Sequence, residues 1–128
     1  MTDIINKVFN QKDEIINLTT QYQKYNINKK SNVNLDEYEK MFEYFNKNFN
    51  EDEIKIIQSI MYFGRECFTG SGVEYKGNKY KVVSIWMRNL NFLIDEKIKK
   101  DVEINQMLEK GQMIGTYFEY GFKELERV

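Results

Sequence analysis

The chain has 128 residues, a formal net charge of −1 and 41% hydrophobic residues, but no histidine, no proline and one cysteine. This length fits a single domain, and the hydrophobic content is sufficient to bury a core. The absence of histidine excludes a Ser-His-Asp triad, a Cys-His dyad and histidine-containing zinc sites, and one cysteine cannot form an internal disulfide. No export signal or long apolar run is visible. We therefore expect a cytoplasmic protein that makes no membrane contact.

The first predicted helix covers residues 3–26, where apolar side chains recur at heptad spacing and Gln11 interrupts the seam. This apolar seam either packs within its own domain or pairs with the seam of a second copy of the chain. Residues 26–34 are polar and contain several asparagines, which indicates a connector rather than a continuing helix.

Two capping-box patterns predict where the next helices begin. Asn34 is followed three residues later by Glu37, and Asn50 is followed in the same way by Glu53. In this spacing each side chain can accept a hydrogen bond from the backbone N–H of the other residue. The sequence therefore predicts a second helix beginning after Asn34 and a third over about residues 51–67.

The third predicted helix carries Gly64-Arg65 directly after a strongly apolar run. Glycine lets another backbone approach closely, and arginine is a permanent cation at the edge of the core. Arg65 is either an anion clamp beside a groove or a structural ion-pair partner of an acid such as Glu66, and we favour the second interpretation. Cys67 is interpreted as a small buried side chain rather than a nucleophile, since no histidine can act as its base.

The glycine-rich stretch 69–72 is the clearest break in the chain. Beyond it, residues 73–82 form either a small β-hairpin or a loop in which Asn78 caps the next helix. Further helices are predicted over residues 83–99, 101–109 and 112–126. The predicted fold class is mainly α, a single compact domain over residues 1–128 with five to six helices and the hairpin as an alternative.

Two charged segments are candidate contact surfaces. Residues 73–88 interleave cations with aromatic rings, a pattern that suits single-stranded nucleic acid, phosphates or an acidic protein, although the rings of such a face can instead turn into the core. Residues 34–53 are rich in carboxylates, which are interpreted mainly as a solvated face. The candidate partner- or anion-binding residues are Arg65, Lys76, Lys79, Tyr80, Lys81 and Arg88, and the candidate acidic contacts are Glu37, Glu43 and Asp52.

Residues 52–125 resemble a small bacterial family of helical domains that has no assigned function. The resemblance rests on Gly64-Arg65, on Trp86 in the following helix, and on the terminal segment Tyr117-Phe118-Glu119-Tyr120-Gly121-Phe122. It implies a helical core over residues 51–128 and leaves residues 1–50 as an added N-terminal helix pair. The resemblance implies no activity.

Size, charge segregation and the lack of a catalytic motif favour a small binding or regulatory protein, of the inhibitor or adaptor type, that contacts a protein partner. We expect no catalysis, no cofactor and no metal site. Self-association is a further expectation, because two-fold dimers are the commonest oligomers. The alternative function is a nucleic-acid or nucleotide-binding module that uses the patch at residues 73–88. An enzyme built on carboxylates and Arg65 is the third alternative.

Overall fold

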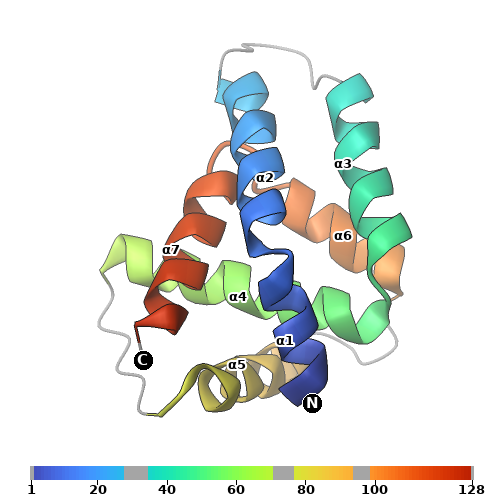
Figure 1. The fold of residues 1–128 in the computed structure, drawn as a ribbon. Helices are drawn as coiled ribbons and strands as arrows, with labels where there is room; N and C mark the ends of the chain where they lie inside the picture. The colour runs from blue at the N-terminus through green and yellow to red at the C-terminus, as the bar shows by residue number, and fades with distance from the viewer. Residues whose placement is uncertain (1, 28–34, 71–76, 94–98, 128) are drawn as a thin grey trace.

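The computed structural model describes residues 2–27, 35–70, 77–93 and 99–127. Within these ranges the chain is helical and contains no strand (Figure 1). The seven helices are α1 (Thr2–Asn10), α2 (Lys12–Ile27), α3 (Leu35–Asn48), α4 (Glu51–Thr69), α5 (Lys79–Leu93), α6 (Lys100–Leu108) and α7 (Ile114–Glu126). The mainly α fold is confirmed, but the described residues form more helices than the five or six predicted.

The additional helix arises because the first predicted helix divides at Gln11. The backbone N–H of Gln11 donates to the carbonyl of Val8 at 3.0 Å, and α2 begins at the next residue. Ile5, Val8 and Phe9 are buried on α1, which packs against α4, whereas α2 packs along α7. The break lets two parts of one amphipathic segment cover different helices. The interruption of the apolar seam at Gln11 was its only sign in the sequence.

The hairpin predicted as an alternative near residues 73–82 is wrong in its second half, because residues 79–82 form the first turn of α5. Asn78 Oδ1 accepts a hydrogen bond from the backbone N–H of Lys81 at 3.1 Å, as a helix cap does. Val82 is buried on this first turn. The alternative in which Asn78 caps a helix is therefore confirmed, while residues 73–76 lie outside the described residues.

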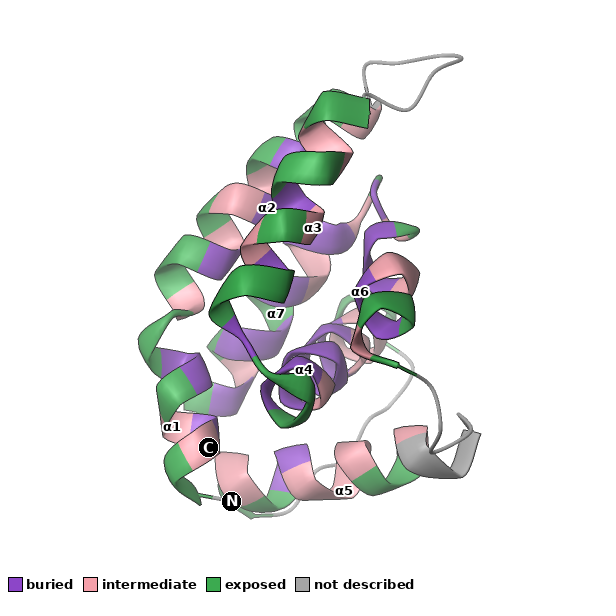
Figure 2. Cartoon of the chain, turned by 90° about the vertical axis from the view of Figure 1, so that its right-hand side faces the viewer, coloured by how far each residue is buried: buried purple, intermediate pink, exposed green. Residues whose placement is uncertain are grey.

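Helix α4 lies at the centre of the fold, with α1 and α7 packed against it on one side and α6 on the other, while α2 packs on α7 (Figure 1). Its middle is buried on every face, including the polar side chains of Gln58 and Ser59. Figure 2 shows that buried residues are concentrated on α4, whereas the outer helices alternate between buried and exposed residues. A helix that is apolar all round must be enclosed by others, which explains why the apolar run before Gly64 became the centre of the fold.

Glycines allow α7 to lie very close to α4 and α2. A Cβ atom on Gly64 would lie 1.7 Å from the carbonyl oxygen of Tyr117, and one on Gly121 would lie 2.4 Å from that of Ile60. On the other side of α7, a Cβ atom on Gly115 would lie 2.6 Å from the Cα atom of Thr20 in α2. The prediction that Gly64 permits a close backbone approach is confirmed, and α7 is the partner.

Polar contacts close the N-terminal end of α4. The backbone N–H of Asn50 donates to Glu53 Oε1 at 2.8 Å, and the N–H of Glu53 donates to Asn50 Oδ1 at 2.9 Å. The second predicted capping box is therefore confirmed. Lys7 of α1 adds an ion pair, with 2.7 Å between its Nζ and Glu53 Oε2. The first predicted box cannot be assessed because Asn34 lies outside the described residues.

Candidate protein-binding surface

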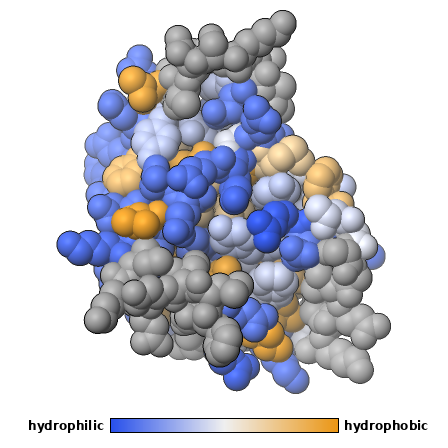
Figure 3. All heavy atoms as spheres, turned by 180° about the vertical axis from the view of Figure 1, so that it is seen from behind, coloured by the Kyte–Doolittle hydropathy of each residue, from blue (hydrophilic) through white to orange (hydrophobic). Residues whose placement is uncertain are grey.

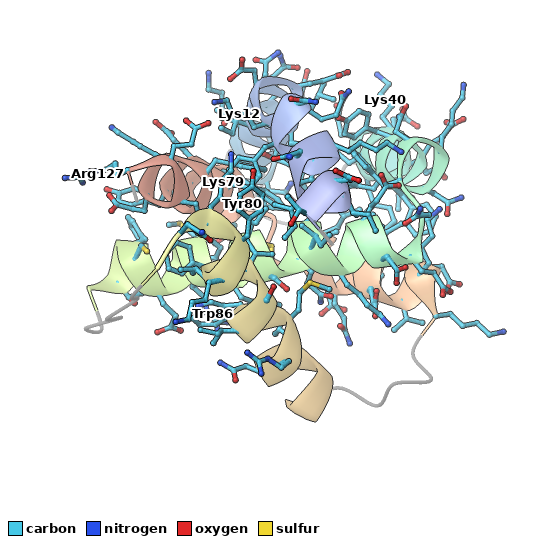
Figure 4. All side chains as sticks on the ribbon, turned by 60° about the horizontal axis from the view of Figure 1, so that its bottom comes forward. Lys12, Lys40, Lys79, Tyr80, Trp86 and Arg127 are labelled. Carbon is cyan, nitrogen blue, oxygen red and sulfur yellow. The ribbon has the colours of Figure 1, made fainter. Side chains whose placement is uncertain are left out.

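Two members of the predicted basic and aromatic surface over residues 73–88 lie in the first turn of α5 and attach this helix to α1. Lys79 and Tyr80 lie at the junction of these helices (Figure 4). Lys79 Nζ is 4.5 Å from the centre of the Phe9 ring, and the Tyr80 hydroxyl donates to Asn6 Oδ1 at 2.6 Å. The half-buried Tyr80 ring therefore has a structural contact within the chain.

The remaining members of that predicted surface divide between core and solvent. Trp86 is half-buried and meets Phe63 of α4 edge to face, with 6.1 Å between ring centres. Lys81 and Arg88 are exposed, and Lys76 lies outside the described residues. The interpretation that the rings of this face turn inward fits both Tyr80 and Trp86. The exposed members of the predicted surface on α5 are therefore the cations Lys81 and Arg88 rather than the rings.

The three predicted acidic contacts do not converge on one site. Glu37 pairs with Lys40 within α3, with 3.4 Å between Oε1 and Nζ. Glu43 is exposed further along α3, and Asp52 is exposed in the first turn of α4. Among the described residues no group of three or more acidic or cysteine side chains is placed to hold a metal ion.

Arg65 makes two contacts on α4 itself. Its Nη2 lies 3.5 Å from Glu66 Oε1, and its guanidinium carbon lies 4.8 Å from the centre of the Tyr62 ring. The ion pair expected from the sequence is therefore present. About a third of the Arg65 side chain, 37%, stays exposed. Arg65 is thus ordered by its neighbours while one side of it still faces solvent.

One turn beyond Arg65, three aromatic rings meet at the surface. Phe68 contacts Tyr120 edge to face, with 5.3 Å between ring centres, and lies 6.2 Å from Tyr117. Phe68 is 42% exposed and Tyr120 is 41% exposed, although both rings are large and carry much apolar surface. We call Tyr62, Arg65, Phe68, Tyr117 and Tyr120 the aromatic patch.

Sequence reasoning missed the aromatic patch because it treated the aromatic residues near the C-terminus as core. In α7, Phe118 and Phe122 are buried, whereas Tyr117 and Tyr120 lie one turn apart on another face. Rings on two faces of one short helix cannot all be buried by one neighbour. This helical periodicity was the available signal.

Cys67 lies beside the aromatic patch, between Glu66 and Phe68 in sequence. Burial raises the pKa of its thiol to about 11, and the charges of Glu124 and Glu66 act in the same direction. The thiol is therefore protonated at neutral pH, which disfavours nucleophilic attack. This environment favours the interpretation of Cys67 as an unreactive, half-buried side chain.

Two buried carboxylates have pKa values shifted in opposite directions. Burial alone would raise the pKa of Glu53, but the hydrogen bonds from Lys7 and Asn50 and the charges of Lys7 and Lys100 lower it overall. Burial raises the pKa of Glu103 in α6, with Lys55 opposing and Glu51 adding to the shift. Glu103 Oε2 has no hydrogen-bond partner among the described residues. Of these two carboxylates, only Glu53 therefore has partners that stabilise its charged form.

Two grooves of similar volume lie on α2. The first, of about 480 Å³, is bounded by the end of α2 and the α6–α7 connection, and it contains Tyr22 and Tyr38. Burial raises the pKa of both tyrosines, so their hydroxyls are protonated at neutral pH and do not act as bases. The second, of about 510 Å³, separates α2 from α7 and is flanked by the Lys12–Glu126 ion pair.

No protein-family model, curated protein or solved structure matches this chain. The resemblance to a bacterial helical family therefore stays a prediction, and the surface must be interpreted from its own geometry. No helix within the described ranges is long and apolar enough to cross a bilayer. Seen from behind, exposed hydrophobic side chains are scattered among hydrophilic ones (Figure 3). Scattered apolar side chains are normal on a protein surface, so this view by itself does not mark a binding site.

Proposed function

We propose that this chain is a small binding protein, of the inhibitor or adaptor type, that acts by direct contact of the aromatic patch with a protein partner. The observation that supports the proposal is the exposed Phe68–Tyr120 ring pair one turn from the ordered Arg65. Tyrosine and arginine are enriched among the residues that dominate binding energy at protein interfaces. Because the rings already contact one another in the free protein, few additional side chains have to be ordered when a partner binds, which lowers the entropic cost of binding.

The rings of the aromatic patch favour a partner with an apolar anchor. Arg65 lies 3.5 Å from Glu66 within the patch, and the exposed Glu119 lines the groove between α2 and α7 on another side of α7. The rings are therefore the main contact that the patch provides, and the partner is expected to present an apolar side chain to them. The aromatic patch alone is smaller than a standard protein–protein interface, so it would form the centre of a larger contact surface.

The experiment compares tagged wild-type protein with two sets of ring deletions in pull-downs from native extract, quantified by mass spectrometry. The test variant is Phe68→Ala with Tyr120→Ala. The matched control is Tyr25→Ala, because Tyr25 of α2 is similarly exposed, at 45%, and lies outside the patch. We expect a defined protein to be retained by wild type and by the control and to be lost with the test variant.

The affinity of the purified partner then gives the size of the effect. We expect the dissociation constant to rise at least about tenfold for the test variant and to stay within about twofold for the control. Equal retention by all three proteins, or a loss that is equal for Tyr25→Ala, would remove the aromatic patch from the function. Melting curves recorded in parallel show whether the test variant remains folded.

A further inference from the structure

Helix α5 carries cations that nothing within the described chain neutralises. It contains Lys79, Lys81 and Arg88 but no aspartate or glutamate. Lys81 and Arg88 are exposed and form no ion pair among the described residues. They are seven residues apart, so they lie on the same side of the helix about 10 Å from each other along its axis. The half-buried Ile85 lies between them on this stripe. We call Lys81, Ile85 and Arg88 the basic stripe.

Helix α3 carries the opposite charge with the same spacing. Asp36, Glu39 and Glu43 are exposed on one side of its first three turns and form no ion pair among the described residues. Asp36 and Glu43 are again seven residues apart, like the two cations of the basic stripe. The exposed Lys40 beside them is paired with Glu37 and therefore neutralised. We call Asp36, Glu39 and Glu43 the acidic stripe.

The two stripes cannot meet within one molecule. In both ribbon views α3 begins at the end of the molecule opposite α5 (Figures 1 and 2). The acidic stripe occupies the first turns of α3, so it lies far from the basic stripe. Two complementary surfaces on different sides of one chain can be brought together by other copies, in a head-to-tail contact.

We propose that copies of this chain associate head to tail, with the basic stripe on α5 of one copy docked on the acidic stripe on α3 of the next. The equal spacing lets Lys81 and Arg88 face two carboxylates at once, with Ile85 between them. A second copy fits α5 better than single-stranded nucleic acid, because Tyr80 and Trp86 contact α1 and α4 instead of offering rings to bases. The aromatic patch takes no part, so this proposal is independent of the proposed function.

The association is expected to be weak and sensitive to salt, because exposed ion pairs are screened within about 8–10 Å at physiological ionic strength. Sedimentation velocity at about 20 mM salt should show a weight-average mass that rises with protein concentration. The same series at about 500 mM salt should show a monomer, since the screening length is then only a few ångströms.

Two charge reversals make the test specific. The variant Lys81→Glu with Arg88→Glu makes both stripes acidic, and the variant Glu39→Lys with Glu43→Lys makes both stripes basic. Each variant alone is expected to stay monomeric at low salt because like charges then face each other. An equimolar mixture is expected to associate again, since every contact in it joins an acidic to a basic stripe. The control is Lys24→Glu with Lys123→Glu, which changes net charge as much as the Lys81→Glu, Arg88→Glu variant does but outside both stripes, and it should associate like wild type.

Several results would overturn the proposal. Wild type that stays monomeric at every concentration, association that survives either stripe reversal, or a mixture that fails to associate would each contradict the contact. Association lost equally in the control would assign the effect to net charge alone. A labelled single-stranded oligonucleotide that binds wild-type monomer but not the Lys81→Glu, Arg88→Glu variant would assign α5 to nucleic acid instead.

Discussion

The two ends of α4 differ in how they meet their surroundings. At the N-terminal end, Asn50, Glu53 and Lys7 satisfy one another, and the Glu53 side chain is nearly inaccessible, with 3% of it exposed. At the C-terminal end, Phe68 contacts the rings of α7 but remains 42% exposed. The first end stabilises the fold, whereas the second presents large rings to solvent at a cost in exposed apolar surface. We propose that the first end serves stability and the second serves binding.

The largest loss of stability is expected from Gly64→Ala, because this substitution separates α7 from α4 and moves Tyr117 and Tyr120 away from Phe68. The added methyl group would lie 1.7 Å from the Tyr117 carbonyl oxygen, which is backbone and cannot move aside. We expect the free energy of unfolding to fall by about 3 kcal/mol or more, as measured by urea denaturation.

The control for Gly64→Ala is Gly70→Ala, at the left-handed cap of α4. Here φ is 67° and no other atom lies within 4 Å of the added methyl group. The expected loss is therefore only about 1 kcal/mol, from backbone strain. Similar losses for the two variants would show that the close helix approach is not the dominant constraint.

An intermediate effect is expected at the N-terminal end from Glu53→Gln. The substitution removes the charge that pairs with Lys7, and we expect a loss of about 1–2 kcal/mol at pH 7. Because the folded-state pKa of Glu53 is lowered, its stabilisation is present above the unfolded pKa of about 4.3 and is lost as pH falls through the folded value. The difference between wild type and variant should therefore shrink below about pH 4. A constant difference across pH would contradict the assigned shift.

Glu103→Gln is a matched substitution with the opposite expected sign. Burial raises the folded-state pKa of Glu103, so the cost of its charge appears as pH rises through that value and is absent at low pH. Removing the charge should raise the free energy of unfolding by roughly 1 kcal/mol at pH 7. The gain should vanish in denaturation series below about pH 4. Destabilisation at pH 7 would show that Glu103 is satisfied as a carboxylate.

The smallest effect on stability is expected at the aromatic patch. Phe68→Ala removes a ring that is 42% exposed, so we expect the free energy of unfolding to fall by about 1 kcal/mol or less. The same substitution should instead raise the dissociation constant for the partner strongly. If Phe68→Ala unfolds the protein as Gly64→Ala does, the ring belongs to the core and the contrast between the two ends fails.

Much of the frame of the fold could be predicted from the sequence because its determinants are local. The capping box at Asn50 and Glu53, the alternative cap at Asn78 and the glycine at the α4–α7 crossing all depend on neighbouring residues or on backbone shape. The interruption of the apolar seam at Gln11 did not by itself predict a break, because the periodicity on both sides of it is that of a continuous helix. Only the packing of α1 on α4 and of α2 on α7 distinguishes the two cases.

The candidate surface was harder to predict, because exposure depends on tertiary packing. Tyr80 and Tyr120 are the same residue type, yet the Tyr80 hydroxyl donates to Asn6 whereas Tyr120 is 41% exposed. Which rings of α7 are covered depends on how it crosses α4, and that crossing is set by contacts between residues far apart in the chain. Composition therefore indicated aromatic content but not the face that carries it.

The two ends of α4 are compared most directly when binding and stability are measured together for one variant at each end. With the captured partner purified, titration calorimetry and thermal melting are applied to Phe68→Ala and Glu53→Gln. We expect Phe68→Ala to melt close to wild type and to bind at least about tenfold more weakly, and we expect Glu53→Gln to melt lower and to bind normally. Weakened binding by Glu53→Gln with normal binding by Phe68→Ala would contradict the central claim.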